Sequence, residues 1–170
     1  MRRGFFDTNV VVYAAIRSPD PRHVTAQRLL TDHIADSSMV CSTQVLQETY
    51  SVLTTKKGVQ RDAALAVVKA LAKEEVVPSK SAFVLRSIEL SQRYQLSVWD
   101  GLMVQAALDA DCDVLYTEDL PAGMRFGKLE VVNPFRVSAH QAQPTYRAGE
   151  DAAPPAATAS PARALRRPRK

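Results

Sequence analysis

Four carboxylates stand out because each lies beside a segment that could carry it to a shared site. They are Asp7 in FFDTN, Glu48 in TQVLQETYSVL, Asp100 in SVWDGLM and Asp119 in LYTEDL. Asp7 and Asp119 each follow a short apolar run that is typical of a strand, whereas Glu48 and Asp100 fall in helical patterns. Carboxylates gathered in one place repel one another unless a divalent cation compensates their charge. The set therefore indicates a metal site.

The donor types narrow the chemistry of such a site. Oxygen ligands without His or Cys favour hard cations, so the expected metal is Mg²⁺ or Mn²⁺. Such a cation positions water and stabilises a phosphoryl transition state, which makes phosphodiester hydrolysis the natural reaction. Other kinds of site are not indicated by the sequence. The three histidines show no metal-ligand spacing, no GxSxG motif supports a Ser–His–Asp site, and no Walker or GxGxxG motif supports nucleotide binding.

Each of the four carboxylates also has a purely structural interpretation. Asp7 could be a turn or helix-cap residue, and Asp119 could cap a short helical turn. Asp100 could lie in the first turn of a helix capped by Ser97, and Glu48 could reach solvent from the edge of an apolar stripe. These alternatives stay open for each residue alone. The four together favour function, because all are expected at the same edge of a sheet.

Hydrophobic periodicity predicts the elements that must position these side chains. Short apolar runs predict strands at 4–6, 39–41, 76–77, 113–116 and 129–132. Helical patterns cover 20–36, 43–57, 60–73, 80–95 and 99–110. The last helix is expected to bury a stripe of Trp99, Met103, Ala106, Ala107 and Ala110. This alternation predicts an α/β three-layer sandwich around a mostly parallel sheet of about five strands, with function at the carboxyl ends of its strands.

A second group of acids is expected at the other end of that sheet. Asp109, Asp111 and Asp113 lie on the connection that enters the fourth strand, so we interpret them as solvated. Glu118 should alternate in direction with Asp119 and is likewise expected in solvent.

Charge divides the chain into two parts. Residues 1–135 hold 15 basic and 16 acidic side chains, whereas residues 136–170 hold seven basic and two acidic ones. The stretch beyond the last apolar run is rich in Ala, Pro and Arg, and it cannot bury enough apolar surface to offset its ordering entropy. We therefore expect a folded domain over 1–138 and a disordered basic tail over 139–170.

Cysteine use and apolar run lengths bear on the compartment. No run approaches about 20 apolar residues, so we expect no membrane-spanning helix. Cys41 and Cys112 are far apart in the sequence and belong to no paired cysteine motif, so we expect them to be reduced and buried. We interpret the chain as cytoplasmic.

Taken in order, these motifs resemble a known family. FFDTNVVVYA, TQVLQETYSVL, WDGLMVQAAL and LYTEDL are similar to the motifs of PIN-domain ribonucleases, above all the VapC toxins of bacterial toxin–antitoxin pairs, over residues 3–135. The four carboxylates match the four acidic positions of the family. Thr117 matches the hydroxyl of its T-x-D motif, and Asn9 matches its D-x-N start, where it could orient Asp7 or a water on the metal.

The resemblance implies more than the residues alone do. It implies Mg²⁺- or Mn²⁺-dependent RNA hydrolysis that leaves 5′-phosphate and 3′-hydroxyl ends. It also implies a homodimer and inhibition by a VapB-like antitoxin protein whose peptide covers the acidic pocket. Asp7, Asp100 and Asp119 would hold the metal, and Glu48 would be a further ligand or orient the attacking water. The tail beyond Phe135 departs from the usual length of the family.

Two other classes of protein remain as alternatives. A haloacid-dehalogenase-like phosphotransferase also carries an Asp after its first strand, but it needs a second Asp where this chain has Asn9. A catalytically silent PIN module could serve as an RNA-binding or assembly scaffold. The loss of an acid would favour that alternative, and all four acids are present.

Overall fold

Alternating strands and helices make up residues 2–136, the part of the chain that this computed structural model describes. The strands are β1 (Gly4–Phe6), β2 (Met39–Ser42), β3 (Glu75–Val77), β4 (Val114–Tyr116), β5 (Arg125–Phe126) and β6 (Leu129–Val132). The helices are α1 (Thr8–Ala15), α2 (Pro21–Ala35), α3 (Thr43–Thr55), α4 (Arg61–Leu71), α5 (Ser81–Tyr94) and α6 (Val98–Asp109). The tail expected over 139–170 lies outside the described residues.

The strands form one six-stranded sheet in the order β3-β2-β1-β4-β6-β5. Every neighbouring pair is parallel except β5 and β6, which form an antiparallel hairpin. β1 lies between β2 and β4, with Phe5 opposite Val40 on one side and Leu115 on the other. All three residues are fully buried, as a central parallel strand covered on both faces requires. The predicted mostly parallel α/β sheet is confirmed.

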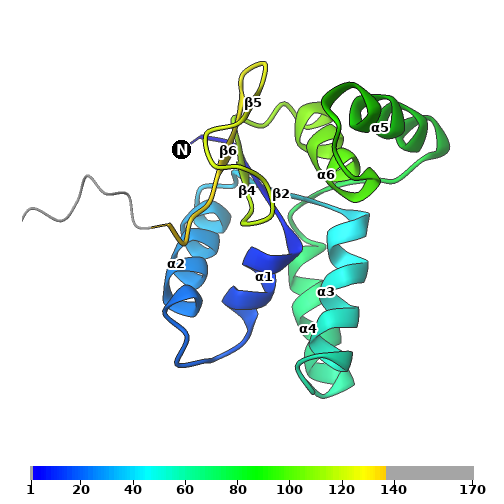
Figure 1. Cartoon of the computed structure of the whole chain (residues 1–170). Coiled ribbons are helices and arrows are strands. Elements are labelled where there is room, and N and C mark those ends of the chain that lie inside the picture. The colour runs from blue at the N-terminus through cyan, green and yellow to red at the C-terminus, as the bar shows by residue number, and fades with distance from the viewer. Residues whose placement is uncertain (1, 137–170) are drawn as a thin grey trace, which may run out of the picture. The chain divides into compact units, whose positions relative to one another are not determined.

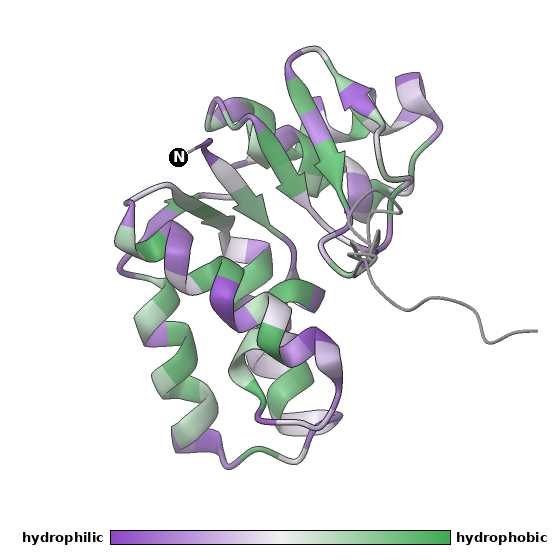
Figure 2. Ribbon diagram, turned by 90° about the vertical axis from the view of Figure 1, so that its left-hand side faces the viewer, coloured by the Kyte–Doolittle hydropathy of each residue, from purple (hydrophilic) through white to green (hydrophobic). Residues whose placement is uncertain are grey.

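Helices cover both faces of the sheet. Figure 1 shows the α5–α6 pair on one side of it and the α1–α2 pair on the other. The α3–α4 pair also packs as a unit and contacts the domain through α1 and β2. Hydrophobic residues dominate the strands and the helix faces toward them, while hydrophilic ones collect in loops and on outer surfaces (Figure 2). The resulting core holds the strands in place, so the loops at their carboxyl ends have a rigid base.

Two short elements escaped the sequence analysis. Helix α1 begins directly after β1, but its Val10–Val12 run consists of β-branched residues, which favour strands, and so gave no helical signal. Strand β5 has only two residues and exists because it pairs with β6 across a turn. Neither omission changes the fold class. Helix α1 does matter to the site, because it starts at one of the candidate carboxylates.

The expected stripe on α6 is correct except at its first member. Met103, Ala106, Ala107 and Ala110 are buried, whereas 66% of the Trp99 surface is exposed. Trp99 lies in the first turn of α6, beyond the region that the neighbouring elements cover. The prediction that its ring is buried is wrong.

Buried polar groups inside the domain are satisfied locally. His33 is fully buried, and its two ring nitrogens are 2.8 Å from the Ser38 hydroxyl and 3.2 Å from the Tyr116 hydroxyl. Gly4 allows this packing, because a Cβ there would come within 2.8 Å of both the His33 and Tyr116 rings. Burial lowers the pKa of His33, so the ring is held neutral. This histidine therefore has a packing role in the interior of the domain.

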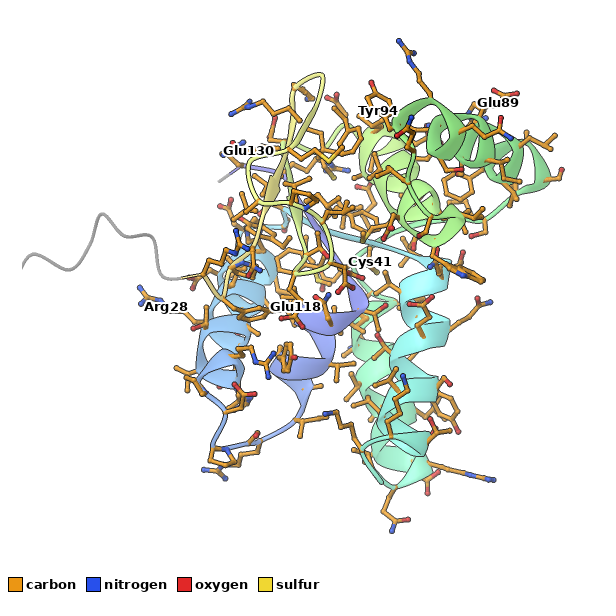
Figure 3. All side chains as sticks on the ribbon, in the orientation of Figure 1. Arg28, Cys41, Glu89, Tyr94, Glu118 and Glu130 are labelled. Atoms are coloured by element: carbon orange, nitrogen blue, oxygen red, sulfur yellow. The ribbon has the colours of Figure 1, made fainter. Side chains whose placement is uncertain are left out.

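Both cysteines are buried and free, and Cys41 lies in the interior of the domain (Figure 3). Burial raises the pKa of each thiol to about 12, which keeps both protonated and unreactive. Across residues 2–136, none of the helices has the length and apolarity needed to cross a membrane.

Candidate active site

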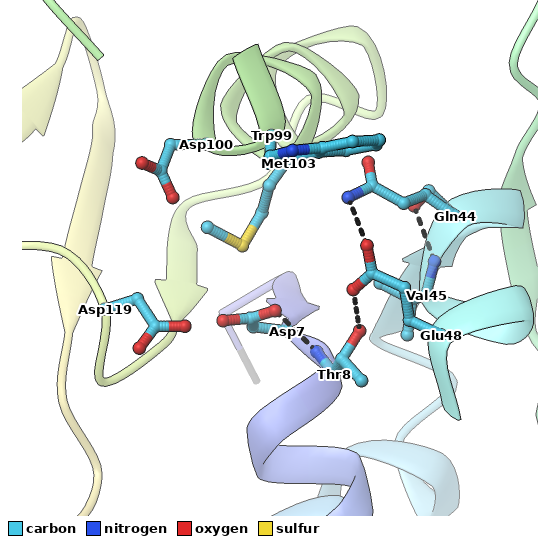
Figure 4. A pocket seen from close by; sticks show the side chains of 10 residues that line it. Asp7, Thr8, Gln44, Val45, Glu48, Trp99, Asp100, Met103 and Asp119 are labelled. Atoms are coloured by element: carbon cyan, nitrogen blue, oxygen red, sulfur yellow. Dashed lines mark hydrogen bonds between the residues drawn. The ribbon is translucent and has the colours of Figure 1, made fainter. Parts of the chain in front are cut away.

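A small polar pocket opens at the carboxyl ends of β1, β2 and β4, the sheet edge where function was expected (Figure 4). Its volume is about 90 Å³. All four candidate carboxylates line it, together with six other residues: Thr8, Ser42, Gln44, Val45, Trp99 and Met103. The structure thus brings Asp7, Glu48, Asp100 and Asp119 to one place from four separate segments of the chain.

Asp7 is the most buried of the four carboxylates, with 9% of its surface exposed. It follows β1 directly and caps α1, because its Oδ1 accepts a hydrogen bond of 2.6 Å from the backbone N–H of Thr8. Its Oδ2 accepts bonds from the Thr117 hydroxyl at 2.6 Å and from the Asn9 side-chain amide at 2.9 Å. The structural role considered for Asp7, a helix cap, is therefore real and coexists with its place in the pocket.

Asn9 and Thr117 connect the carboxylates that follow β1 and β4. The Asn9 amide donates to Asp119 Oδ2 at 3.0 Å as well as to Asp7. The Thr117 hydroxyl, which is fully buried, accepts a bond from the Asp119 backbone N–H at 3.1 Å. The two secondary polar residues expected from the sequence thus contact both aspartates. Their bonds fix the loop after β4 against the start of α1.

Glu48 reaches the pocket from α3, on the side opposite Asp119 (Figure 4). The Thr8 hydroxyl donates to its Oε2 at 3.0 Å, and the Gln44 amide one turn earlier donates to its Oε1 at 2.8 Å. These bonds turn the carboxylate toward the pocket rather than outward into solvent. Sequence reasoning missed Thr8 and Gln44, since recognising Thr8 required helix α1 and Gln44 carries no charge.

Asp100 is held by the beginning of α6. The Ser97 hydroxyl accepts a bond of 3.1 Å from the Asp100 backbone N–H and donates one of 2.7 Å to its Oδ2. Ser97 is therefore the N-cap, as the sequence indicated. Trp99, one residue earlier, lines the same pocket and was not expected there.

The pocket holds acids and no base. None of its lining residues is Lys, Arg or His, and within residues 2–136 none of the four carboxylates takes part in an ion pair. Burial, reinforced by the charges of Asp119 and Glu48, raises the pKa of Asp7 to about 6 despite the bonds from Thr117 and Thr8. The pocket thus concentrates negative charge that no ion pair within residues 2–136 neutralises.

This donor set fits a hard divalent cation in chemical type. All candidate ligands are oxygens, and the Asn9 side-chain oxygen is a further buried acceptor without a hydrogen-bond partner. Among the described residues, however, no three His, Cys, Asp or Glu side chains are arranged to hold one ion. Each carboxylate is instead bound to hydroxyl, amide or backbone donors. Side chains would have to leave some of these bonds to bind a cation.

Glu118, next to Asp119, turns away from the pocket as expected but is not simply solvated. Its side chain accepts a bond of 3.0 Å from the Tyr13 hydroxyl and lies 3.4 Å from the Arg22 guanidinium. The expectation that Glu118 is simply solvated is wrong, because Tyr13 and Arg22 both contact its carboxylate. Arg22 also stacks on the Tyr13 ring, so the three side chains form one cluster. This contact anchors the loop after β4 on its outer side.

The family model for the PIN domain matches residues 4–120, so the chain belongs to the PIN domain family. The match includes all four pocket carboxylates. A search of curated proteins gives no match.

Solved structures with the same fold come from toxin–antitoxin systems. VapC20 of Mycobacterium tuberculosis, a sarcin-ricin loop cleaving toxin, is 21% identical with a TM-score of 0.57, covering 68% of this chain and 89% of its own. A toxin–antitoxin complex from Klebsiella pneumoniae is 19% identical with a TM-score of 0.58, covering 79% and 99%. VapBC2 of Rickettsia felis, bound to a promoter DNA fragment, is 18% identical with a TM-score of 0.53, covering 75% and 96%. These likenesses establish a shared fold.

Proposed function

We propose that the chain is a Mg²⁺- or Mn²⁺-dependent endoribonuclease, and that it is the toxin of a VapBC-type pair. One observation carries the proposal: four carboxylates converge on one pocket at the carboxyl edge of the sheet with no basic side chain among the lining residues. A fold has no structural need to collect unpaired acids, because their mutual repulsion destabilises it. A function that requires a cation explains why they are there.

Each residue then has a stated role. Asp7, Asp100 and Asp119 hold the cation, while Glu48 is a further ligand or orients the attacking water. Asn9 and Thr117 keep Asp7 and Asp119 in position through the bonds described above. When bound, the cation supplies a water of lowered pKa and neutralises charge on the reacting phosphate. The pocket has no histidine, so the carboxylates are the only bases available to orient that water.

We further propose a VapB-like antitoxin as the protein partner and a homodimer as the working unit in the cytoplasm. Support for the antitoxin comes from the family membership and from the toxin–antitoxin complexes that share the fold. The two cysteines are buried and free, which is typical of proteins in a reducing compartment. Light scattering of the purified protein, alone and with its co-expressed neighbouring gene product, tests both assemblies.

Cleavage of a structured RNA in the presence of Mg²⁺ or Mn²⁺ tests the enzymatic proposal. The substitution Asp7→Asn is nearly isosteric and removes one negative charge from the pocket. We expect it to lower the rate by roughly 10²-fold or more, as the loss of other electrostatic contributors to a transition state does. Asp111→Asn serves as the matched control, because Asp111 lies outside the pocket and its side chain is mostly exposed.

The controls decide between the alternatives. Cleavage that persists in EDTA would point to a metal-independent activity or a contaminant and would contradict the proposal. Equal rates for wild type and Asp7→Asn would remove the carboxylates from the mechanism. An inactive wild type that still binds RNA would favour a catalytically silent PIN module.

A further inference from the structure

Trp99 is the most unusual side chain at the pocket. It is the only tryptophan in the chain, and 66% of its surface is exposed although it lines the acidic pocket. A tryptophan left in water keeps a large apolar surface hydrated, and such residues are concentrated at binding sites. The ring therefore calls for an explanation that packing within the domain does not supply.

The indole is held at the pocket mouth by a rigid element. The Ser97 cap fixes the first turn of α6, and Met103, one turn further along the same helix, is buried in the core. Figure 4 shows the ring extending from α6 toward Gln44, across the pocket from Asp119. Within residues 2–136, no other aromatic ring or cation is stacked on it. One flat face of a large ring is thus available beside the carboxylates.

The charge of the pocket indicates what this face would bind. Carboxylates repel the phosphates of a nucleic acid, and no lining residue offers a positive charge. A single-stranded substrate therefore needs an anchor that does not depend on charge. Stacking on an aromatic ring meets this need, because every nucleobase has a π-face. A base lies one sugar away from its phosphate, so a phosphate over the carboxylates brings a neighbouring base to the rim.

We propose that Trp99 is a substrate-binding residue that stacks on an unpaired base next to the scissile phosphate. The inference rests on the proposed ribonuclease function and adds to it that the cleaved segment is single-stranded at that base. Stacking of this kind is present both before and during the reaction. It should therefore lower KM and leave kcat nearly unchanged.

Fluorescence tests the proposal directly, because Trp99 is the only indole in the chain. The probe is a six-nucleotide oligoadenylate in EDTA, with an abasic ribose-phosphate oligomer of equal length as its control. The indole is excited at a wavelength that the tyrosines do not absorb. We expect the oligoadenylate to quench the indole emission and the abasic oligomer to leave it unchanged. Equal quenching by both probes, or by neither, would overturn the proposal.

Variants give an independent readout. Trp99→Ala should bind oligoadenylate about tenfold more weakly and raise KM by a similar factor, whereas Trp99→Phe keeps a ring and should stay within about threefold of wild type. Leu85→Ala is the matched control, since Leu85 is 62% exposed on α5 and is not part of the pocket. Both residues are exposed, so all variants should melt within a few degrees of wild type.

The outcomes separate this inference from the function on which it rests. A wild type that cleaves RNA while Trp99→Ala keeps the same KM would overturn the stacking role alone. A wild type that binds oligoadenylate through Trp99 but cleaves no RNA would overturn the ribonuclease proposal alone. Loss of antitoxin binding in Trp99→Ala with unchanged KM would assign the ring to protein docking and would also overturn the inference.

Discussion

The acidic side chains at the amino ends of the strands have basic partners, whereas the four acids in the pocket at the carboxyl ends have none among residues 2–136. At the amino ends of the strands, acids are paired with bases: Glu75 with Arg3, Glu130 with Arg2 and Arg125, and both Asp111 and Asp113 with Lys128. At the carboxyl ends, four acids share a pocket that no base lines. Figure 3 labels Glu130 near the first end and, near the second, Glu118, which lies outside the pocket and is paired with Arg22.

One acid at each end, Asp113 and Asp7, shows the difference in its pKa. The backbone N–H of Arg3 and the nearby Lys128 lower the pKa of Asp113, whereas burial and neighbouring acids raise that of Asp7. The pairing at the amino ends is explained by its effect on stability, since each of those charges has a partner. The pocket leaves charge uncompensated, which is typical of sites that act on an external ion or substrate.

Matched substitutions at the two ends should give the largest difference. Asp119→Asn keeps an acceptor for the Asn9 amide, so it removes charge with little change of shape. We expect RNA cleavage to slow by about 10²-fold. Asp113→Asn likewise keeps an acceptor for the Arg3 N–H and should leave the rate within about twofold of wild type. A similar loss in both variants would mean that the division between the two ends is irrelevant to activity.

Asp7→Asn should stabilise the protein in the absence of metal. At pH 7 the charge of Asp7 is unfavourable, since its pKa of about 6 lies above the ordinary 3.8. Removing that charge should raise the free energy of unfolding by about 1 to 2 kcal/mol. Asn9 has a free side-chain oxygen that can accept from the new amide if its own amide turns over, which gives up the Asn9 bond to Asp119 and offsets part of the gain. Denaturant unfolding of both proteins in EDTA measures the change.

The pH dependence of that difference identifies its source. Between about pH 4 and 6 the folded chain keeps a proton on Asp7 that the unfolded chain has released. The contribution of Asp7 to the free energy of unfolding therefore falls as pH rises through this range. The gain from Asp7→Asn should therefore be largest above pH 6 and vanish near pH 4. His33 acts with the opposite sign, because its lowered pKa makes the folded chain less stable as pH falls below 6.5. A difference between the two proteins that is constant with pH would exclude the charge of Asp7 as its cause.

Much of this contrast is readable from the sequence. Asp7 and Asp119 follow buried apolar runs, and parallel topology places the ends of those runs at one edge. Glu48 and Asp100 could be placed from helical periodicity and the Ser97 cap. These signals are local, so they survive without knowledge of the packing.

The remaining details depend on contacts between distant segments. The Thr8 hydroxyl meets Glu48 only because α1 packs on α3, and the β-branched residues of α1 hid that helix. The exposure of Trp99 depends on where the neighbouring elements stop covering α6, which periodicity does not contain. Likewise, the partners of Glu118 come from α1 and α2.

Deletion of the tail should affect the stability of the folded domain least of all these changes. Residues 139–170 lie outside the described structure, and their composition predicts no packed contact with the domain. We expect a chain that ends at residue 138 to melt within a few degrees of the full chain. A calorimetric scan of both proteins measures this, and a larger drop would show that the tail packs on the domain.

Binding of Mn²⁺, followed by the melting temperature, tests the central claim most directly, namely that the unpaired acids exist to hold a cation. A ligand that binds only the folded state stabilises it by about 2.7 kcal/mol at 100 times its Kd. Wild type and Asp111→Asn should therefore show the same rise in melting temperature with added Mn²⁺, and Asp7→Asn should show little or none. An equal rise in all three proteins, or no rise in wild type, would contradict the account.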